Sequence, residues 1–458
     1  MARSSRITPA SLAPLLRSRA PVSATELADA LGCNRTTVLR TLADFGDGLV
    51  TMGESRRTRY ALRREIRGAG NRWPIHRIDE NGRAAEWARL EALHERLWRI
   101  EWAADAPDWA EFFMNREGIW QGFPYFLSDA RPQGYLGRAT ARRLARPLQV
   151  PEDPRQWSDE DIVAYLQAEG GDLPGDLVVG DAGLRRALAE ILHPEIKGEE
   201  NYPELAALAA SGLPGSSAGG EQPKFLTAVR GSDGQRRDVL VKFSPPVDQG
   251  TGRRWADLLL GEFHAHEVLA AAGLSVSGVR VVDREGRRFL EVPRFDRTAA
   301  GGRLGVVSLE ALHAAAIGSH AREWPEAMQN LRRSGLVDEE ALRVVRRLHA
   351  FGELIGNTDM HFGNLAFWLD DRLPLRVAPA YDMLPMLWAP GPQGELVGRH
   401  FRPAPPAPAM ADDWHEAAGW AEDYWRRFAT DERLSAEFAG FARDASSVVA
   451  KLRSFVGG

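Results

Sequence analysis

Cysteine is nearly absent from this chain of 458 residues. Its one cysteine, Cys33, can form neither an internal disulfide framework nor a cluster of cysteine ligands for a metal. Long apolar runs are lacking too, because no stretch approaches the roughly 20 residues that cross a bilayer. The first segment contains Arg3 and Arg6 but no continuous apolar core, so it does not resemble a secretory signal. We therefore expect a cytoplasmic protein with no membrane partner.

Lysine is also in short supply. The chain has only four lysines, Lys197, Lys224, Lys242 and Lys451, beside 54 arginines. Lysine carries a compact charge, whereas arginine presents a wide planar fork of donors, so the two are not interchangeable. A chain that otherwise prefers arginine is expected to have a chemical reason for each lysine that it keeps.

The net charge of −5 is unevenly distributed along the chain. Residues 1–77 contain fourteen arginines, no lysine and six acidic residues, a balance of +8, so the remainder carries −13. A basic segment joined to an acidic body indicates a polyanionic partner for the basic segment alone.

Residues 8–67 follow the pattern of a winged helix-turn-helix. Apolar residues recur at helical spacing in 24–31 and 34–45, Gly32 supplies the turn between them, and Asn34 is a suitable N-cap. Residues 49–62 read as two short strands around a wing tip. In this motif the second helix enters the major groove and the wing contacts the DNA backbone. The predicted DNA-binding residues are Asn34, Arg35, Thr36, Thr37 and Arg40 on the helix and Arg56, Arg57 and Arg59 on the wing.

The arginines of the first segment have a second interpretation, and DNA binding has a consequence for assembly. An arginine-rich solvated surface is the alternative interpretation, because arginine is common throughout the chain. DNA half-sites usually require two copies of a protein, so a homodimer is a possible assembly.

The segments after residue 67 differ in composition and in hydrophobic periodicity. Residues 86–103 have the composition of a helix, and residues 122–137 that of a loop with Pro and Gly. From residue 213 a Gly/Ser loop leads into alternating strands, then a helix at 255–273 and two more strands at 279–296. Helical periodicity dominates from residue 309 to the end, apart from the Pro/Gly-rich stretch 388–410.

The most informative motif is GNTDMHFGN at residues 356–364. Asp359 and Asn364 have the D-x₄-N spacing of a kinase catalytic loop, and Asp382 follows eighteen residues after Asn364. Phosphoryl transfer needs a carboxylate that takes the proton of the attacking hydroxyl, and an amide and a second carboxylate that hold Mg²⁺. Asp359 has the position of the first, and Asn364 and Asp382 have those of the metal ligands. Taken singly, each residue is more typical of a turn.

A second motif lies upstream, where a Gly/Ser loop precedes a strand that contains Lys242. Glycines let backbone amides approach phosphates closely, and Lys242 would contact the same phosphates from its strand. An ordinary hairpin with a solvated lysine is the alternative. Glu262 or Glu267 on the following helix could pair with Lys242, and we prefer Glu262. No Walker A pattern is present. The loop residues assigned to ATP are Ser216, Ser217, Ala218, Gly219 and Gly220.

These segments together resemble the HipA family of bacterial serine/threonine kinase toxins. The resemblance covers about residues 213–390 and includes SSAGGEQPK, LVKFS, EFHAHEVLAAAGL, VPRFDR, GNTDMHFGN and PAYDMLP. It implies ATP and Mg²⁺ as cofactors, protein hydroxyls as substrates, and Pro293, Arg294 and Phe295 as the hinge facing adenine. It also implies autophosphorylation of a loop serine, for which Ser216 is the best-placed match, with Ser217 next to it.

The expected fold is α+β, with a winged helix-turn-helix at 1–67 and a HipA-like N-terminal subdomain at 68–137. A kinase N-lobe at 138–297 and a helical C-lobe at 298–458 complete the expected two-lobed, protein-kinase-like body. The expected function is an ATP- and Mg²⁺-dependent serine/threonine protein kinase of toxin type, with an antitoxin-like DNA-binding domain in the same chain. The alternative is a DNA-binding transcription regulator whose kinase-like body senses nucleotide or is inactive. A small-molecule kinase shares the same phosphate machinery.

Overall fold

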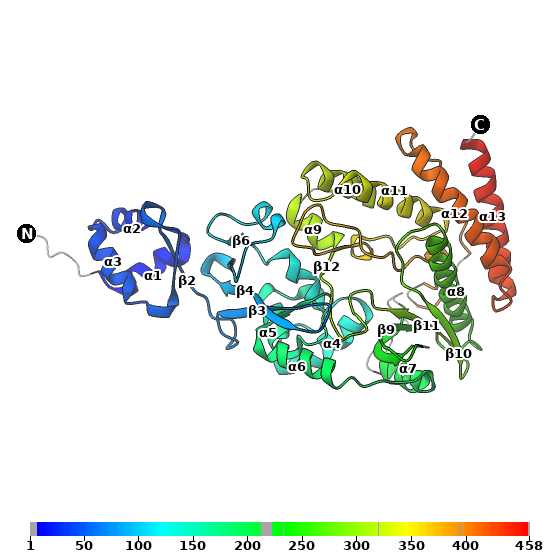
Figure 1. The fold of residues 1–458 in the computed structure, drawn as a ribbon, viewed down its shortest axis with the longest axis horizontal. Coiled ribbons are helices and arrows are strands. Elements are labelled where there is room, and N and C mark those ends of the chain that lie inside the picture. The colour runs from blue at the N-terminus through cyan, green and yellow to red at the C-terminus, as the bar shows by residue number, and fades with distance from the viewer. Residues whose placement is uncertain are drawn as a thin grey trace, which may run out of the picture.

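The computed structural model describes residues 7–211, 222–231, 233–318, 320–391, 393–396 and 398–456. The fold is α+β. The molecule is elongated, with its first three helices at one end and its last two at the other (Figure 1). The predicted phosphate-loop residues Ser216, Ser217, Ala218, Gly219 and Gly220 lie outside the described residues, and so does the side chain of Arg56.

The first part of the structure, residues 7–64, is called the head. It contains α1 (Pro9–Ser18), α2 (Ala24–Leu31), α3 (Arg35–Ala43) and a hairpin of β1 (Leu49–Met52) and β2 (Arg59–Leu62). Ser23 and Glu26 form a capping box that begins α2, and Gly32 ends this helix with a φ of +60°. The Asn34 side chain accepts from the Thr37 backbone N–H and begins α3. A small core joins these elements through Leu12, Leu16, Leu27, Val38 and Leu42.

The head packs directly on the next part of the chain. The Arg64 backbone N–H donates to the Ala92 carbonyl at 2.8 Å. Arg63 donates to Glu91 at 2.7 Å, and this carboxylate is fully buried. An apolar cluster from both sides covers the contact and contains Val50, Met52, Ala61, Leu93 and Ile119. The head is therefore held by strand pairing, burial and charge rather than by a linker alone.

A second sheet follows, with the strand order β6–β5–β4–β3–β7. Its strands are β3 (Arg72–Ile78), β4 (Ala84–Ala92), β5 (Leu97–Trp102), β6 (Ile119–Gln121) and β7 (Leu177–Val179). The helices of this region are α4 (Gly134–Leu148), α5 (Asp159–Glu169) and α6 (Gly180–Leu192). Because β7 pairs with β3, a strand from the segment assigned to the predicted N-lobe belongs to the sheet of the preceding segment.

The helix expected at residues 86–103 was wrong, because this segment forms β4 and β5. Trp98 and Ile100 are buried, whereas Leu97, Arg99 and Glu101 between them are partly exposed, which is the alternation of a strand. The pairing of β4 with β3 and β5 satisfies its backbone on both edges. Tertiary packing thus overrides the high helix propensity of Ala, Leu, Glu and Arg.

The third sheet has the order β10–β11–β9–β8. Its strands are β8 (Lys224–Arg230), β9 (Arg236–Phe243), β10 (Arg280–Arg284) and β11 (Arg287–Pro293). One face packs on α7 (Tyr202–Ser211), and α8 (Gly250–Ala271) packs against β11, β10 and β9. The strands expected at 225–229, 238–244, 279–283 and 287–296 and the helix at 255–273 are confirmed, with small shifts of their ends.

The remainder of the chain is mostly helical and packs around a short two-stranded antiparallel sheet. This sheet pairs β12 (Val306–Ser308) with β13 (Ala366–Trp368). The helices are α9 (Leu309–Ala316), α10 (Trp324–Arg333), α11 (Glu339–Leu354), α12 (Ala411–Ala429) and α13 (Ala436–Val456). Among the helices of the described residues, none has both the length and the apolar composition to cross a membrane.

Candidate functional site

Strand alternation on β9 decides where Lys242 points. Val239, Val241 and Phe243 face the apolar core under α7, so Leu240 and Lys242 face the opposite side of the sheet. That side is covered by α8, which carries Glu262. The Lys242 side chain is only 2% exposed, so its charge must be matched by nearby groups.

Two carboxylates surround the Lys242 ammonium group. Lys242 Nζ donates to both oxygens of Glu262, at 2.5 and 2.7 Å, and it also donates to Asp382. The structure therefore pairs Lys242 with Glu262 and not with Glu267, which is exposed on the same helix. Lys242, Glu262 and Asp382 are called the lysine cluster below. It contains one cation and two carboxylates.

The pKa shifts in the lysine cluster show which groups carry charge. Burial opposes ionisation of Asp382, but the charges of Lys242 and Lys224 outweigh it and hold the Asp382 pKa below its ordinary value. Burial, reinforced by the Asp382 charge, raises the Glu262 pKa. The two carboxylates outweigh burial at Lys242 and raise its pKa. Asp382 and Lys242 are thus ionised at neutral pH.

The lysine cluster forms part of the wall of a cavity of about 480 Å³, called the main cavity. Apolar side chains from β8, β9, β11 and β12 line it, including Leu226, Leu240, Val292 and Val307. The predicted hinge residues Pro293, Arg294 and Phe295 lie at its edge. The Asp382 side chain is 26% exposed, whereas that of Glu262 is 1% exposed, so Asp382 is the carboxylate that a ligand can reach.

Asn357 connects the two predicted catalytic loops. Its Nδ2 donates to the Asp382 carbonyl at 3.2 Å, and its Oδ1 accepts from the Asp359 backbone N–H at 3.0 Å. Asn364 Nδ2 donates to the Asp359 carbonyl at 2.8 Å, which closes the loop on itself. A hydrogen bond of 2.6 Å from the Tyr381 hydroxyl to the Gly363 carbonyl adds a second connection. The loops of Asp359, Asn364 and Asp382 are therefore neighbours.

Asp359 and Asp382 line different cavities. Asp359 is exposed and lines a second cavity of about 610 Å³, together with His361 and Glu353. Asn364 is half-buried between the loops. Asp382 has a φ of +53°, a left-handed conformation that is uncommon outside glycine and often found at functional sites.

Sequence reasoning missed several residues of this region. Asn357 sits beside the recognised motif positions, but only the fold shows that its amide bridges two loops. Asp129 lines the main cavity and accepts from the Ser308 backbone and hydroxyl, both at 2.6 Å. Lys224 lines the same cavity, and the scarcity of lysine was the available signal for it.

The predicted DNA-binding residues lie on the head. Asn34, Arg35, Thr36, Arg40 and Arg57 are exposed, and Thr37 is half-buried. The Asn34 carboxamide oxygen is engaged in capping α3. Arg59 is held by the chain itself, since its Nη1 donates to Glu26 at 3.0 Å and to the Pro21 carbonyl at 3.3 Å.

Two protein-family models and one curated protein match this chain. The model of the YjjJ-like toxin middle domain matches residues 69–188, and that of the HipA-like C-terminal domain matches residues 216–454. Toxin YjjJ of Escherichia coli strain K12 is 34% identical over 441 residues, which cover 95% of this chain and 96% of that protein.

Two solved structures are also similar. One is a chain of the Shewanella oneidensis MR-1 HipA, HipB and operator DNA complex, at 14% identity and a TM-score of 0.48, covering 82% of this chain and 96% of that one. The other is the Helicobacter pylori proinflammatory kinase CtkA, at 12% identity and a TM-score of 0.37, covering 51% and 91%. The two family models and the extent of the identity to Toxin YjjJ decide the assignment. The chain belongs to the HipA family of toxins.

Proposed function

We propose that this chain is a serine/threonine protein kinase that transfers a phosphoryl group from ATP and carries its own DNA-binding domain. The lysine cluster is the observation that supports the kinase proposal most. It puts one ammonium group and one reachable carboxylate on the wall of a cavity that also has apolar walls, formed by Leu226, Leu240, Val292 and Val307. A base would lie between the apolar walls at the hinge, and the phosphates would lie toward Lys242.

The residues of the main cavity fit a nucleotide with Mg²⁺. Mg²⁺ prefers oxygen ligands and is commonly held by one or two carboxylates together with phosphates. Asp382 and Asn364 would hold it, since Asp382 is ionised and is the carboxylate of the lysine cluster that a ligand can reach. When bound, Mg²⁺ neutralises charge on the transferring group. Glu262 positions Lys242 and is too buried to be a ligand.

Asp359 is the proposed general base. The substrate hydroxyl oxygen forms a bond to the γ-phosphorus, and the bond from that phosphorus to the bridging oxygen breaks. ADP leaves with the electron pair, and the hydroxyl proton passes to the Asp359 carboxylate. The exposed position of Asp359 leaves room for a protein substrate. Asn357 and Asn364 keep the Asp359 backbone in place through the bonds described above.

The kinase proposal is tested by incubating the full chain with γ-labelled ATP and locating the label by peptide mass spectrometry. We expect label on Ser216 or Ser217, and a loss of about 10²-fold or more in Asp359→Asn. Glu267→Gln on α8 is the matched control and should label normally. Nucleotide binding without transfer to the chain or to added proteins would favour the regulator. Normal labelling of Asp359→Asn would remove the base assignment.

The head is proposed to be a winged helix-turn-helix that binds DNA. Arg35, Thr36 and Arg40 are exposed on α3, the second helix of the turn centred on Gly32, and Arg57 is exposed near the hairpin tip. Because Arg59 is paired with Glu26, it is a weaker candidate for phosphate contact.

DNA binding is tested by fluorescence anisotropy with genomic fragments upstream of the gene. The double variant Arg35→Ala, Arg40→Ala should weaken binding and reduce the salt slope by about two. Arg17→Ala, Arg19→Ala removes the same charge from α1 and its end, and should retain most of the affinity. Equal loss in both variants would mean that only net charge matters and that α3 is not the reading helix.

A further inference from the structure

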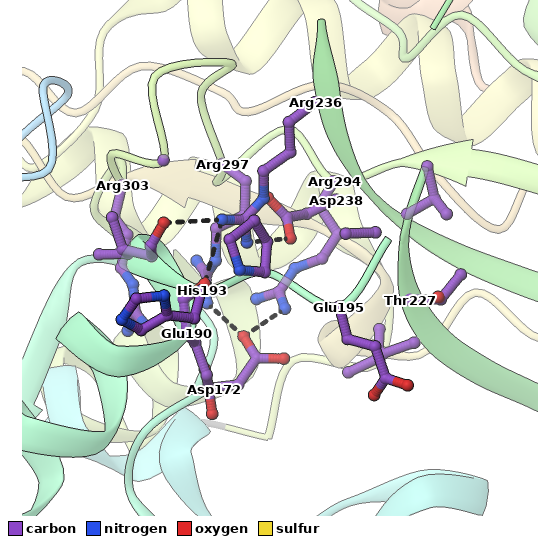
Figure 2. Close-up of a pocket in the computed structure, with 16 residues that line it drawn as sticks. Asp172, Glu190, His193, Glu195, Thr227, Arg236, Asp238, Arg294, Arg297 and Arg303 are labelled. Atoms are coloured by element: carbon purple, nitrogen blue, oxygen red, sulfur yellow. Dashed lines mark hydrogen bonds and ion pairs between the residues drawn. The ribbon is translucent and has the colours of Figure 1, made fainter. Parts of the chain in front are cut away.

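A second pocket lies behind the hinge, next to the main cavity. The end of α6, strands β8 and β9 and the chain from Arg294 to Arg303 surround it, and Arg236, Arg294, Arg297 and Arg303 line it (Figure 2). We call it the arginine pocket. Its volume is about 230 Å³, below the roughly 300–1,000 Å³ of pockets for nucleotide-sized ligands. It has room for a small ion or for a few waters, which occupy about 30 Å³ each.

Two of the four arginines are fully neutralised. Arg294 and Arg297 both donate to Asp172, at 2.7 and 2.8 Å, and both donate to Asp296, at 2.9 and 2.8 Å. Their remaining donors reach backbone carbonyls, including that of Leu173. This set has two positive and two negative charges and leaves nothing for a ligand.

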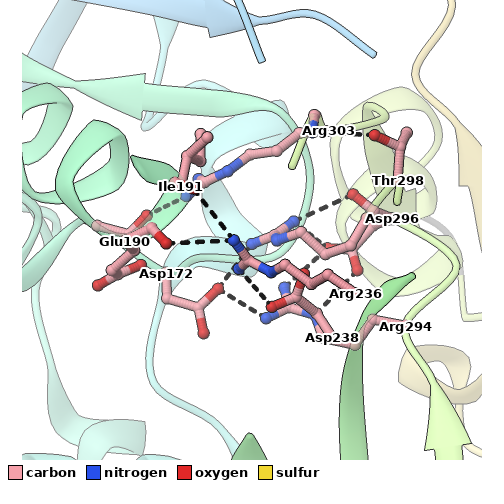
Figure 3. A network of polar contacts seen from close by, with 12 residues as sticks. Asp172, Glu190, Ile191, Arg236, Asp238, Arg294, Asp296, Thr298 and Arg303 are labelled. Carbon is pink, nitrogen blue, oxygen red and sulfur yellow. Dashed lines mark hydrogen bonds and ion pairs between the residues drawn. The ribbon is translucent and has the colours of Figure 1, made fainter. Parts of the chain in front are cut away.

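The charge of Arg236 is neutralised, but one of its N–H groups has no hydrogen-bond partner among the described residues. Its Nη2 donates to Asp238 at 2.6 Å, and its Nη1 donates to the carbonyls of Glu190 and Ile191. Its Nε is buried and has no hydrogen-bond partner among the described residues. Figure 3 shows this guanidinium between Glu190 and Asp238, close to Arg294 and Arg303.

Arg303 is the charge in excess. It is 3% exposed, and its Nη2 donates to the Gly171 carbonyl at 2.6 Å. Its Nε and Nη1 are buried with no partner in the described parts of the chain, and no carboxylate there forms an ion pair with it. Buried donors without partners are rare and cost stability, and a buried cation without a counter-charge costs more. Burial and then Arg297 lower the Arg303 pKa to about 10, so the group is still ionised at neutral pH.

Two carboxylates, Glu190 and Glu195, also line the arginine pocket and could balance the charge of Arg303. Glu195 pairs with Lys197 at 2.5 Å, whereas Glu190 is exposed and forms no ion pair within the described parts of the chain. Burial and the Asp172 charge raise the Glu190 pKa, whereas Arg303, Arg297 and Arg294 act in the opposite direction. As a carboxylate that lines the pocket, Glu190 opposes entry of an anion, and with Asp172 it acts as a distant counter-charge for Arg303.

We propose that the arginine pocket binds a small oxyanion of the size of phosphate, held by the guanidinium groups of Arg303 and Arg236. Guanidinium groups bind tetrahedral oxyanions through paired donors, and the unpartnered N–H groups supply such donors. Asp172 and Arg294 line both this pocket and the main cavity, so the ion lies directly behind the hinge. The proposal does not depend on kinase activity.

Binding of inorganic phosphate to the full chain, measured by isothermal titration calorimetry, tests the proposal. We expect saturation at one ion per chain, weakened by about tenfold or more in Arg303→Gln and by several-fold in Arg236→Gln. Arg237→Gln, the neighbouring exposed arginine on β9, is the matched control and should bind as the unaltered chain does. Glu190→Gln should bind more tightly, because it removes the opposing charge. Sulfate, whose charge does not change near neutral pH, should give the same order.

Three results would overturn the proposal. Phosphate affinity of Arg303→Gln equal to that of the unaltered chain would place the ion elsewhere. Loss of binding in Lys224→Gln with no loss in Arg303→Gln would place it in the main cavity. Weak, non-saturating uptake that no variant changes would show only association with an arginine-rich surface. Circular dichroism of each variant separates loss of the site from loss of folding, and the tightening in Glu190→Gln requires a folded protein.

Discussion

The lysine cluster and the arginine pocket lie on neighbouring sides of the hinge. Their buried charges are neutralised in different ways. The lysine cluster has two carboxylates for one cation, whereas the arginine pocket leaves Arg303 without an ion pair among the described residues. A compact ammonium fits between two carboxylates in a narrow space, and a guanidinium fork reaches several chain segments at once. We therefore propose different ligands for the two: a metal cation with its nucleotide beside the ionised, reachable Asp382, and an oxyanion beside the Arg303 guanidinium.

The two clusters also differ in what they hold together. The lysine cluster joins β9, α8 and the Asp382 loop, all of which line the main cavity. The arginines of the other pocket bind the backbone of residues 171–175 to the chain after β11. The lysine cluster concentrates charge where a ligand can reach it. The arginines of the other pocket hold neighbouring chain segments together through hydrogen bonds to their backbone. The predictions below separate these two uses.

The largest effect is expected from Lys242→Met. It leaves two buried carboxylates without their cation, which should lower the free energy of unfolding by about 3–5 kcal/mol. Urea denaturation at neutral pH measures this loss, and ATP binding should disappear as well. Lys451→Met, on the exposed face of α13, makes the same change and should stay within about 0.5 kcal/mol of the unaltered chain. Comparable losses of unfolding free energy in the two variants would mean that the ion pairs of Lys242 do not stabilise the fold more than an exposed lysine does.

A smaller loss is expected from Asp296→Asn, because Asp296 lines the main cavity and pairs with Arg294 and Arg297 of the arginine pocket. Asp296 accepts from Arg294, from Arg297 and from the Gly175 backbone N–H, but Asp172 still pairs with both arginines in the variant. The free energy of unfolding should fall by about 2–3 kcal/mol, measured by urea denaturation. Asp233→Asn, which removes an exposed carboxylate paired with Arg237, should have no measurable effect. Nucleotide affinity should fall less in Asp296→Asn than in Lys242→Met.

The smallest effect is a pH dependence. Burial opposes ionisation of Asp296, but Arg294 and Arg297 outweigh it and lower its pKa from 3.8 to about 2. A carboxylate with a lowered pKa in the folded state contributes stability that is complete above its ordinary pKa and is lost as pH falls through the folded value. The stability difference between the unaltered chain and Asp296→Asn should therefore be constant above about pH 5 and shrink toward pH 2. A difference independent of pH over this interval would contradict the ion pairs.

Local chemistry made part of the site predictable. Lys242 stood out because lysine is rare, and the spacing of Asp359, Asn364 and Asp382 indicated two loops that the fold does place side by side. The DNA-binding, catalytic and ATP-binding roles of these residues stay predictions. The separation of Asp359 and Asp382 into two cavities could not be read from spacing, since it depends on how the loops pack.

The failures have physical causes. Residues 86–103 are rich in helix formers, but they pair with neighbouring strands, and Glu91 among them is buried and accepts from Arg63 and Arg99. Asn81-Gly82, a pair typical of tight hairpin turns, was an unused signal. The arginine pocket was missed because each arginine resembles a surface charge in an arginine-rich sequence, and Asp172 lies far from Arg294 along the chain.

The reachable carboxylate of the lysine cluster, Asp382, is proposed to act with a metal-bound nucleotide. Calorimetric titration of a non-hydrolysable ATP analogue, with and without Mg²⁺, tests it in the unaltered chain and in Asp382→Asn. We predict that Mg²⁺ tightens binding about tenfold or more in the unaltered chain and has little effect in Asp382→Asn. Equal affinities with and without Mg²⁺ in the unaltered chain, or the same Mg²⁺ effect in both proteins, would contradict it.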